Sequence, residues 1–361
     1  MNRTGFLWEK LVSFDNILKA YDNTVRGKGY RQCVLLFNKD LEQSLLSLQK
    51  KLMTKNYKPG EYATFTIYEP KRRMISAAPF IDRIVHHCLV NVIGPVFEAA
   101  FVSQSYANRI GKGTHRAVRD VQNAMRLNRY IMHCDIVKYF ASVDHDILKS
   151  LIRRKIKDPD VIWLVDTIID CGNPQETVTD YFNGDSLSTP LERRKGLPIG
   201  NLTSQFFANV YLNGLDHFVK EKLGCPFYAR YVDDIVVLDS SKSKLWDICG
   251  EINQYIEKLR LRLHPNKQHV RPVYRGITFL GQVIFPERRL LPKRNIKRFM
   301  RRMKHFQNRL EEGAMPIDAI RHSFQSWLGH AKQANTHRLR ESLYEKYPFL
   351  RSLDSVEVTL S

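Results

Sequence analysis

The sequence lacks the features that mark disulfide-rich, zinc-binding, secreted and membrane-spanning proteins. Its six cysteines include no CxxC pair, which argues against a zinc knuckle or a dense disulfide scaffold and predicts reduced, buried thiols. No apolar run approaches the ~18 residues that a bilayer-spanning helix needs, and the mixed apolar and charged residues of 1–14 differ from a signal peptide. No internal repeat or low-complexity tract is present. We therefore expect a cytoplasmic globular protein with no membrane partner.

Acidic residues are scarce relative to basic ones. The 361 residues carry 37 Asp and Glu against 57 Lys and Arg, which gives a formal net charge of +20. A field of this sign attracts polyanions, either nucleic acid or an anionic membrane, and the lack of a membrane-spanning run favours nucleic acid. The length predicts two or three lobes, and a hydrophobic content of 43% is typical of a protein with a folded core.

The hydrophobic pattern predicts mixed helices and strands, followed by a basic helical region that starts near 288. The expected helices cover 41–52, 82–92, about 144 onward, 200–215, 292–310 and 317–328. The expected strands cover 62–69, 130–135, 276–285 and a hairpin formed by 227–231 and 235–238. The helix after Pro292 combines an apolar stripe with a cationic outer face.

The sharpest local feature is an acidic turn between two apolar strands. Asp233 and Asp234 lie between 227–231 and 235–238, so a hairpin would concentrate their charge at its tip. Acidic residues often occupy solvated turns with no further role, but another carboxylate, Asp135, ends a second apolar strand. Such a cluster repels itself unless it binds a cation. Mg²⁺ fits, because it prefers carboxylate and phosphate oxygens.

These residues resemble the palm motifs of reverse transcriptases, and the resemblance covers most of the chain. The segment from Asp135 to Phe140 resembles the first palm motif, in which the aspartate binds metal and the aromatic residue excludes a ribose 2′-hydroxyl. Phe140 would then select dNTPs, unless it is an ordinary core residue. The resemblance implies two Mg²⁺ ions, with Mn²⁺ as a substitute, on Asp135, Ile136, Asp233 and Asp234. The ions would activate a primer 3′-hydroxyl and neutralise departing pyrophosphate.

Two upstream segments resemble finger motifs of the retroelement and group II intron branch. The first contains Lys71 and Arg73, which would clasp the nucleotide triphosphate, although a solvated basic turn has the same composition. The second, Ser105-Tyr-Ala-Asn-Arg109, would place Arg109 against template or nucleotide.

The most discriminating stretch is Gly-Leu-Pro-Ile-Gly-Asn-Leu-Thr-Ser-Gln over 196–205. Group II intron enzymes usually have Pro-Gln-Gly and then Ser-Pro here, whereas this chain has Ile199 and Gln205 in place of the glutamine and the proline. The pattern resembles reverse transcriptases of diversity-generating retroelements, which misincorporate opposite adenines of a template-repeat RNA and so rewrite a target gene by mutagenic retrohoming. An isoleucine at Ile199 would remove hydrogen bonds that hold the templating base pair; alternatively, Ile199 only packs. Both residues would lie at the nucleotide.

The last motifs concern proton transfer and duplex binding. The segment His264-Pro-Asn-Lys267 resembles the motif whose lysine lies near pyrophosphate, so Lys267 is a candidate general acid, although a lone lysine is more often a surface residue. Segments 279–281 and 326–330 resemble the primer grip and the thumb. The basic helix would track the template–primer duplex through phosphate contacts. The predicted nucleic-acid-binding residues are Lys293, Arg294, Lys297, Arg298, Arg301 and Arg302.

We therefore expect an α+β right-hand polymerase. Its predicted parts are an N-terminal region with fingers (1–129), a palm of antiparallel sheet backed by helices (130–288, with part of the fingers interleaved) and a basic helical thumb (289–361), with no appended domain. The implied activity is that of a bacterial or phage-encoded RNA-directed DNA polymerase. Its partners would be template RNA, the RNA/DNA duplex, dNTPs and a small basic helical accessory variability determinant. The alternatives are a group II intron-like or host-defence reverse transcriptase of ordinary fidelity, and a catalytically silent RNA-binding scaffold.

Overall fold

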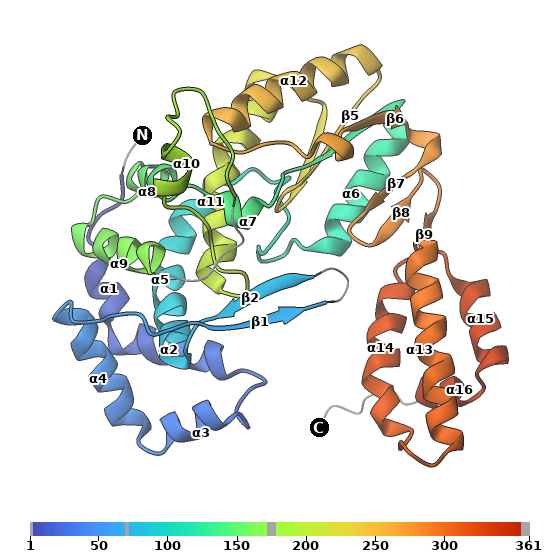
Figure 1. Ribbon diagram of the computed structural model, residues 1–361, viewed down its shortest axis with the longest axis horizontal. Helices are drawn as coiled ribbons and strands as arrows, with labels where there is room; N and C mark the ends of the chain where they lie inside the picture. Colours follow the sequence, from blue (N-terminus) through green and yellow to red (C-terminus); the bar gives the residue numbers. More distant parts are fainter. Residues whose placement is uncertain (1–2, 69–71, 172–177, 355–361) are drawn as a thin grey trace.

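A computed structural model describes residues 3–68, 72–171 and 178–354, and Figure 1 shows helices arranged around small antiparallel sheets. The α+β class predicted from the sequence is confirmed by this mixture of helices and antiparallel strands. The helices before the central sheet are α1 (Trp8–Val12), α2 (Phe14–Val25), α3 (Gln32–Asn38), α4 (Leu41–Met53), α5 (Phe80–Glu98) and α6 (Thr114–Leu127). Strands β1 (Ala63–Ile67) and β2 (Arg73–Ala77) pair antiparallel between α4 and α5.

The central sheet positions the predicted acidic residues. It has the order β4-β5-β3-β6, and its strands are β3 (Tyr130–Asp135), β4 (Phe227–Tyr231), β5 (Asp234–Asp239) and β6 (His269–Pro272). All its pairings are antiparallel. Between these strands lie α7 (Tyr139–Ser142), α8 (His145–Arg153), α9 (Pro159–Asp170), α10 (Thr189–Glu192), α11 (Leu202–His217) with a π-helical end (Phe218–Lys222), and α12 (Lys242–Lys258).

Both faces of the central sheet are covered, because its strands carry apolar residues at consecutive positions. Met132 and Val237 belong to the largest core, which also includes residues of α5, α11 and α12. Ile131 and Val236 point to the opposite face and pack in a second core with residues of α6 and of a small three-stranded sheet. Burial on both faces fixes the register of the strands, since a slip of one residue would move the side chains of each core to the opposite face of the sheet.

The three-stranded sheet corrects one expectation from the sequence. The predicted single strand over 276–285 is two strands, β7 (Ile277–Phe279) and β8 (Gln282–Ile284), and β9 (Arg289–Leu290) adds to β8. Leu280 and Gly281 both have positive φ, 48° and 80°, which reverses the chain in a tight two-residue turn.

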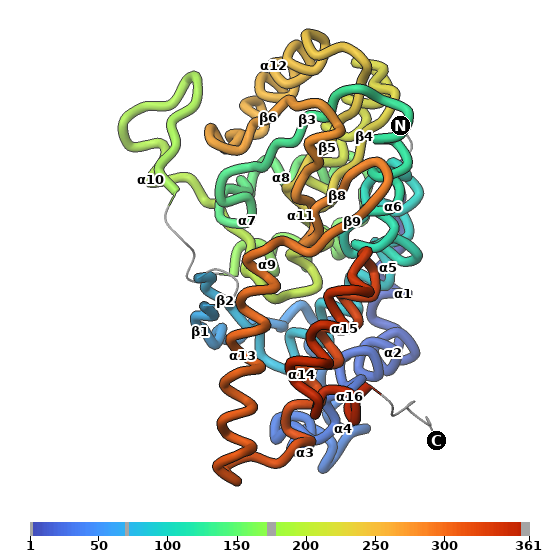
Figure 2. The backbone as a smooth tube through the Cα atoms, turned by 90° about the vertical axis from the view of Figure 1, so that its right-hand side faces the viewer, coloured from blue at the N-terminus to red at the C-terminus, as the bar shows by residue number. Residues whose placement is uncertain are grey.

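Helices α13 (Lys293–Glu311), α14 (Asp318–Ala331), α15 (His337–Lys346) and α16 (Phe349–Asp354) form a separate bundle, seen below the central sheet in Figure 2. Their apolar faces enclose a core of their own. The bundle meets the three-stranded sheet where His330 Nε2 lies 3.2 Å from Gly281 O. Asn335 adds two contacts of 2.8 Å with the backbone of Arg289.

Two further expectations need adjustment. Cys33 is exposed and Cys171 is partly buried, whereas the other four cysteines are buried as predicted, and all six thiols are free. Helix α5 is long and apolar enough to cross a membrane by length and composition, so the expectation that no apolar run approaches that length is wrong. Half of the apolar window is buried in the protein, and α5 packs against α2 and α11, as a core helix does.

Candidate active site

Three carboxylates meet at one end of the central sheet. Asp135 ends β3 and lies directly opposite Asp234, the first residue of β5, so both side chains leave the same face about 5 Å apart at Cβ. Asp233 lies beside them in the turn between β4 and β5. The hairpin and the acidic strand end predicted from the sequence are therefore brought together.

The three carboxylates of this cluster differ in their electrostatic surroundings. Burial raises the pKa of Asp233 to about 7, and the charges of Asp135 and Asp234 act in the same direction. The other two carboxylates are held by bases: Lys267 Nζ pairs with Asp135 Oδ2, and His133 Nε2 lies 3.0 Å from Asp234 Oδ1. The chain thus places one cation, Lys267, and one imidazole, His133, against the carboxylates that flank Asp233.

The donor set fits a hard divalent cation, because carboxylate oxygens are the ligands that Mg²⁺ prefers. Within 3–68, 72–171 and 178–354, no three Asp, Glu, His or Cys side chains already stand in a metal-binding arrangement. A metal ion on Asp135 would compete with Lys267, which pairs with one of its two carboxylate oxygens. Ile136 pairs with Leu263, but the hydrogen bonds of that bridge involve Val137 N and Asp135 O. The carbonyl of Ile136 itself therefore points away from Leu263, to the side of the sheet edge where the Asp233 turn lies.

The turn that carries Asp233 has a strained backbone, which a hydrogen bond from a buried arginine stabilises. Val232 has a φ of 59°, a left-handed conformation that is rare for a β-branched residue. Its carbonyl accepts a hydrogen bond of 3.0 Å from Arg230 Nη1. Arg230 is fully buried and forms a two-pronged pair with Asp216, with both N–O distances 2.6 Å.

The same buried arginine joins the turn to the upstream segment that resembles a finger motif. Arg230 Nη2 donates to Ser105 Oγ at 3.1 Å, and Nη1 lies 3.2 Å from Asn209 Oδ1. Tyr228 donates its hydroxyl to Asp216 Oδ1 at 2.6 Å. The sequence interpretation missed this network. Its only signal is an arginine inside the otherwise apolar strand 227–231, which requires a buried acid somewhere in the fold.

The family model described as reverse transcriptase (RNA-dependent DNA polymerase) matches residues 58–284, which contain the three carboxylates. The chain belongs to this family. Membership confirms the predicted right-hand polymerase fold. It also implies template nucleic acid and nucleotide substrates, and enzymes of the family generally use divalent metal ions, typically Mg²⁺.

Relatives of the reverse transcriptase include Protein YkfC of Escherichia coli, 24% identical over 70% of this chain and 75% of that protein. The group II intron-encoded protein LtrA of Lactococcus lactis is 24% identical over 59% of this chain but only 35% of its own length. Nuclear intron maturase 1 of Arabidopsis thaliana is 28% identical over 34% of this chain and 18% of its length. A solved structure of apo telomerase from Candida tropicalis is similar with a TM-score of 0.43, at 14% identity over 66% of this chain and 58% of that one.

The predicted finger residues have mixed outcomes. Lys71 lies outside the described residues. Arg73 is exposed at the start of β2. Arg109 is turned inward: it pairs with Glu98 and donates from Nη1 to Val102 O and Ser105 O. Because these contacts use its guanidinium, we expect a structural role for Arg109 in place of the predicted contact with template or nucleotide.

The remaining predicted nucleotide-binding residues lie on a connected path. Phe140 is partly buried against the main core, and its carbonyl accepts a hydrogen bond of 2.7 Å from Leu197 N. Ile199 O accepts one of 3.1 Å from Ser76 N of β2. Gln205 lies in the first turns of α11 and is partly buried. The path joins the first palm motif to the β1–β2 hairpin, while contact of these residues with a nucleotide stays a prediction.

The predicted duplex-binding residues all lie on α13. Lys293, Arg294, Lys297, Arg301 and Arg302 are exposed, whereas Arg298 is partly buried and donates to Asn295 Oδ1 at 3.0 Å. The apolar side of α13 packs through Phe299 and Met303. The cationic face is therefore open to solvent, and its contact with a duplex stays a prediction.

We expect Mg²⁺ to stabilise the protein more at pH 8 than at pH 6. The folded-state pKa of Asp233 is raised to about 7, so in the metal-free protein its contribution to stability is present below pH 4 and is lost as the pH rises through 7. Mg²⁺ binds the deprotonated carboxylate and offsets that loss. Differential scanning calorimetry with and without Mg²⁺ should show a rise in Tm of a few degrees at pH 8, a smaller rise at pH 6 and none in Asp233→Asn. An equal shift at both pH values would contradict this assignment.

Proposed function

We propose that the chain is an RNA-directed DNA polymerase that synthesises cDNA by two-metal phosphoryl transfer. The convergence of Asp135, Asp233 and Asp234 at one end of the palm sheet carries the proposal. Two Mg²⁺ ions bound there would supply Lewis-acid activation of the attacking hydroxyl and stabilise the leaving pyrophosphate. Asp233 and Asp234 would hold the ions at the turn, and Asp135 would hold them from β3.

Two other residues would act around the phosphates. Lys267 stands at Asp135, so on metal binding its ammonium group would be released beside the leaving phosphates, where it could donate a proton. Phe140 would border the sugar and exclude a 2′-hydroxyl. The test is primer extension on an RNA template with Mg²⁺ and either dNTPs or rNTPs, followed by sequencing of the product. Continued absence of synthesis with the native RNA and accessory protein would favour the silent scaffold.

We further propose that synthesis is error-prone at template adenines and serves to diversify a target gene. The support is the side chain of Ile199 on a fixed backbone. Its carbonyl is hydrogen-bonded to β2, and Gly200, at φ 121°, lies so close to β2 that a Cβ would meet Ile75 Cγ2 at 3.2 Å. Because the backbone is anchored, a polar residue at this position would differ from isoleucine mainly in side-chain hydrogen bonding.

Ile199→Gln is expected to lower the error frequency at adenines about 2- to 10-fold, the effect of one hydrogen bond. Deep sequencing of cDNA from a defined RNA measures this frequency. Ile199→Leu serves as the matched control, because it changes shape without adding a polar group. If both variants keep the wild-type error pattern, Ile199 only packs.

A second candidate is a group II intron-like reverse transcriptase of ordinary fidelity. The similarity to LtrA and to the Arabidopsis intron maturase favours it, while the Ser204-Gln205 pair favours the diversity-generating branch. Faithful cDNA from wild type would decide for this candidate. The proposal of error-prone, diversity-generating synthesis also includes a template-repeat RNA, a small basic accessory protein and a cytoplasmic location.

A further inference from the structure

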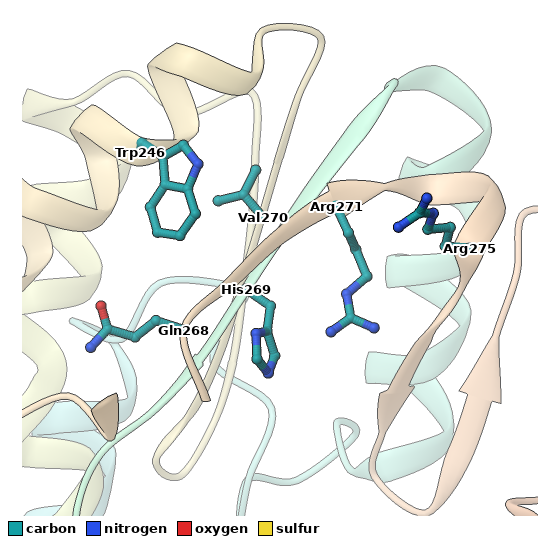
Figure 3. A pocket seen from close by; sticks show the side chains of 6 residues that line it. All are labelled: Trp246, Gln268, His269, Val270, Arg271 and Arg275. Atoms are coloured by element: carbon teal, nitrogen blue, oxygen red, sulfur yellow. The ribbon is translucent and has the colours of Figure 1, made fainter. Parts of the chain in front are cut away.

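A hollow of about 390 Å³ lies at the outer edge of the central sheet, and none of the residues assigned a role above lines it. Figure 3 shows it in front of β6, with Trp246 from α12 on one side and the two guanidinium groups on the other. It is lined by Trp246, Gln268, His269, Val270, Arg271 and Arg275.

This edge is poorly suited to adding a strand from another protein. His269 and Arg271 of β6 lie opposite His133 and Ile131 of β3. The backbone hydrogen bonds on either side of this pairing show that the odd-numbered residues of β3 direct their N–H and C=O groups towards β6. Within β6, Val270 is therefore the residue whose N–H and C=O both point outward. Pro272 has no N–H, and charged side chains flank the short strand. Short, charged, proline-containing edges disfavour strand addition.

The charges of the hollow are unbalanced. None of its six lining residues is acidic, and in 3–68, 72–171 and 178–354 no ion pair is formed by Arg271 or Arg275. Burial, Arg271 and His133 lower the pKa of His269, which shows that the cationic groups lie close together. Guanidinium groups without carboxylate partners are the donors that bind phosphate.

The hollow also offers a stacking surface. The side chain of Trp246 is 45% exposed, unusual for so large an aromatic residue. Beside it, Gln268 supplies an amide, whose oxygen accepts from Cys249 Sγ at 3.5 Å. An exposed aromatic ring next to arginines binds unpaired bases while the arginines hold the backbone phosphates.

The position links the hollow to the catalytic face. His269 lies opposite His133, and His133 contacts Asp234, so His269, His133 and the carboxylates share one face of the sheet. Strands β5 and β6 flank β3, so the hollow is two strand spacings, about 10 Å, from the strand that carries Asp234.

We propose that this hollow binds a single-stranded segment of nucleic acid that extends from the polymerase site, with a base on Trp246 and phosphates on Arg271 and Arg275. The proposal rests on the proposed polymerase function only for the presence of nucleic acid on the palm. Single strands of RNA and DNA share the required chemistry. A duplex does not, because its bases are already stacked.

The test measures equilibrium binding of a labelled single-stranded RNA of about 10 nucleotides, within the span of one such groove, as a function of salt. Arg271→Ala with Arg275→Ala is expected to reduce the slope of log K against log salt by about 1.4, which is 0.7 per phosphate contact. Trp246→Ala is expected to weaken binding at least about 5-fold, and Trp246→Phe to restore most of it.

Two controls make the result specific. Lys10→Ala with Lys19→Ala removes the same charge from exposed positions of α1 and α2, on the opposite side of the molecule in Figure 1, and should leave the slope unchanged. Arg271→Ala with Arg275→Ala should cause the same loss of affinity in an Asp233→Asn background, which separates this proposal from failure of the catalytic one.

Loss of affinity for RNA would assign the hollow to template, and loss for single-stranded DNA would assign it to product; either supports the proposal. It is overturned if the hollow variants bind both single strands like wild type. It is also overturned if Lys10→Ala with Lys19→Ala has an equal effect, or if a blunt duplex loses as much affinity as the single strands.

Discussion

Asp233→Asn is expected to reduce cDNA synthesis by at least about 10³-fold, because metal coordination supplies several kcal/mol of transition-state stabilisation. The substitution keeps the size of the side chain and removes the charge that the turn between β4 and β5 presents beside Asp135 and Asp234. The measurement is primer extension on RNA under single-turnover conditions.

The control for this prediction is Asp239→Asn, at the far end of β5, the strand that follows the turn. Asp239 pairs with Lys244 at 2.9 Å. Burial acts to raise the pKa of Asp239, but its contacts with Lys244 and Ser241 outweigh burial and lower the pKa below its ordinary value. Its loss should affect stability slightly and synthesis little. Asp233→Asn should remain folded, with a melting temperature at least that of metal-free wild type, because a buried charge has been removed. Substantial synthesis by a folded Asp233→Asn protein would reject the proposed site.

Arg230→Met is expected to lower the free energy of unfolding by about 3–5 kcal/mol, the usual cost of leaving one partner of a buried ion pair alone. Arg230 and Asp216 are both fully buried, so the remaining carboxylate would have no solvent to screen it. Urea denaturation measures the loss. Adding Asp216→Asn removes the orphaned charge while keeping an acceptor for Tyr228, and should restore a large part of the stability.

Activity should not return with stability in the double variant. The hydrogen bond from Arg230 to Val232 O is still missing, so the strained turn that carries Asp233 loses its internal support. We expect the double variant to need a higher Mg²⁺ concentration for half-maximal synthesis, which a purely structural role would not produce. A stable double variant with wild-type Mg²⁺ dependence would limit the network to folding.

Local patterns predicted the elements that carry the chemistry. Strand β3 and the β4–β5 hairpin follow from apolar runs that end in acids, and their register brings Asp135 opposite Asp234. Helix α11 was expected over 200–215 and spans Leu202–His217. In these segments the local sequence preference and the tertiary packing agree.

The missed features depend on partners distant in the chain. Asp216 is 14 residues from Arg230, and Ser105 is 125 residues away, so no local period reports their contact. Arg109 was predicted to contact template or nucleotide, because Glu98 and the backbone carbonyls that bind its guanidinium group come together only in the folded protein. The turn at Leu280 was missed because the apolar run continues through it while the backbone reverses.

The separate core of the α13–α16 bundle has a consequence for the reaction cycle. In the proposed polymerase reaction the duplex would advance by one step after each nucleotide addition, so some of the protein contacts with the duplex would have to break and re-form. The contacts of His330 with Gly281 and of Asn335 with Arg289 contribute about 0.5–1.5 kcal/mol each. Opening them leaves the apolar interiors on both sides of the joint intact. If the basic helix α13 binds the duplex as predicted, it would therefore be able to release and rebind the duplex within one cycle while the carboxylates keep their register.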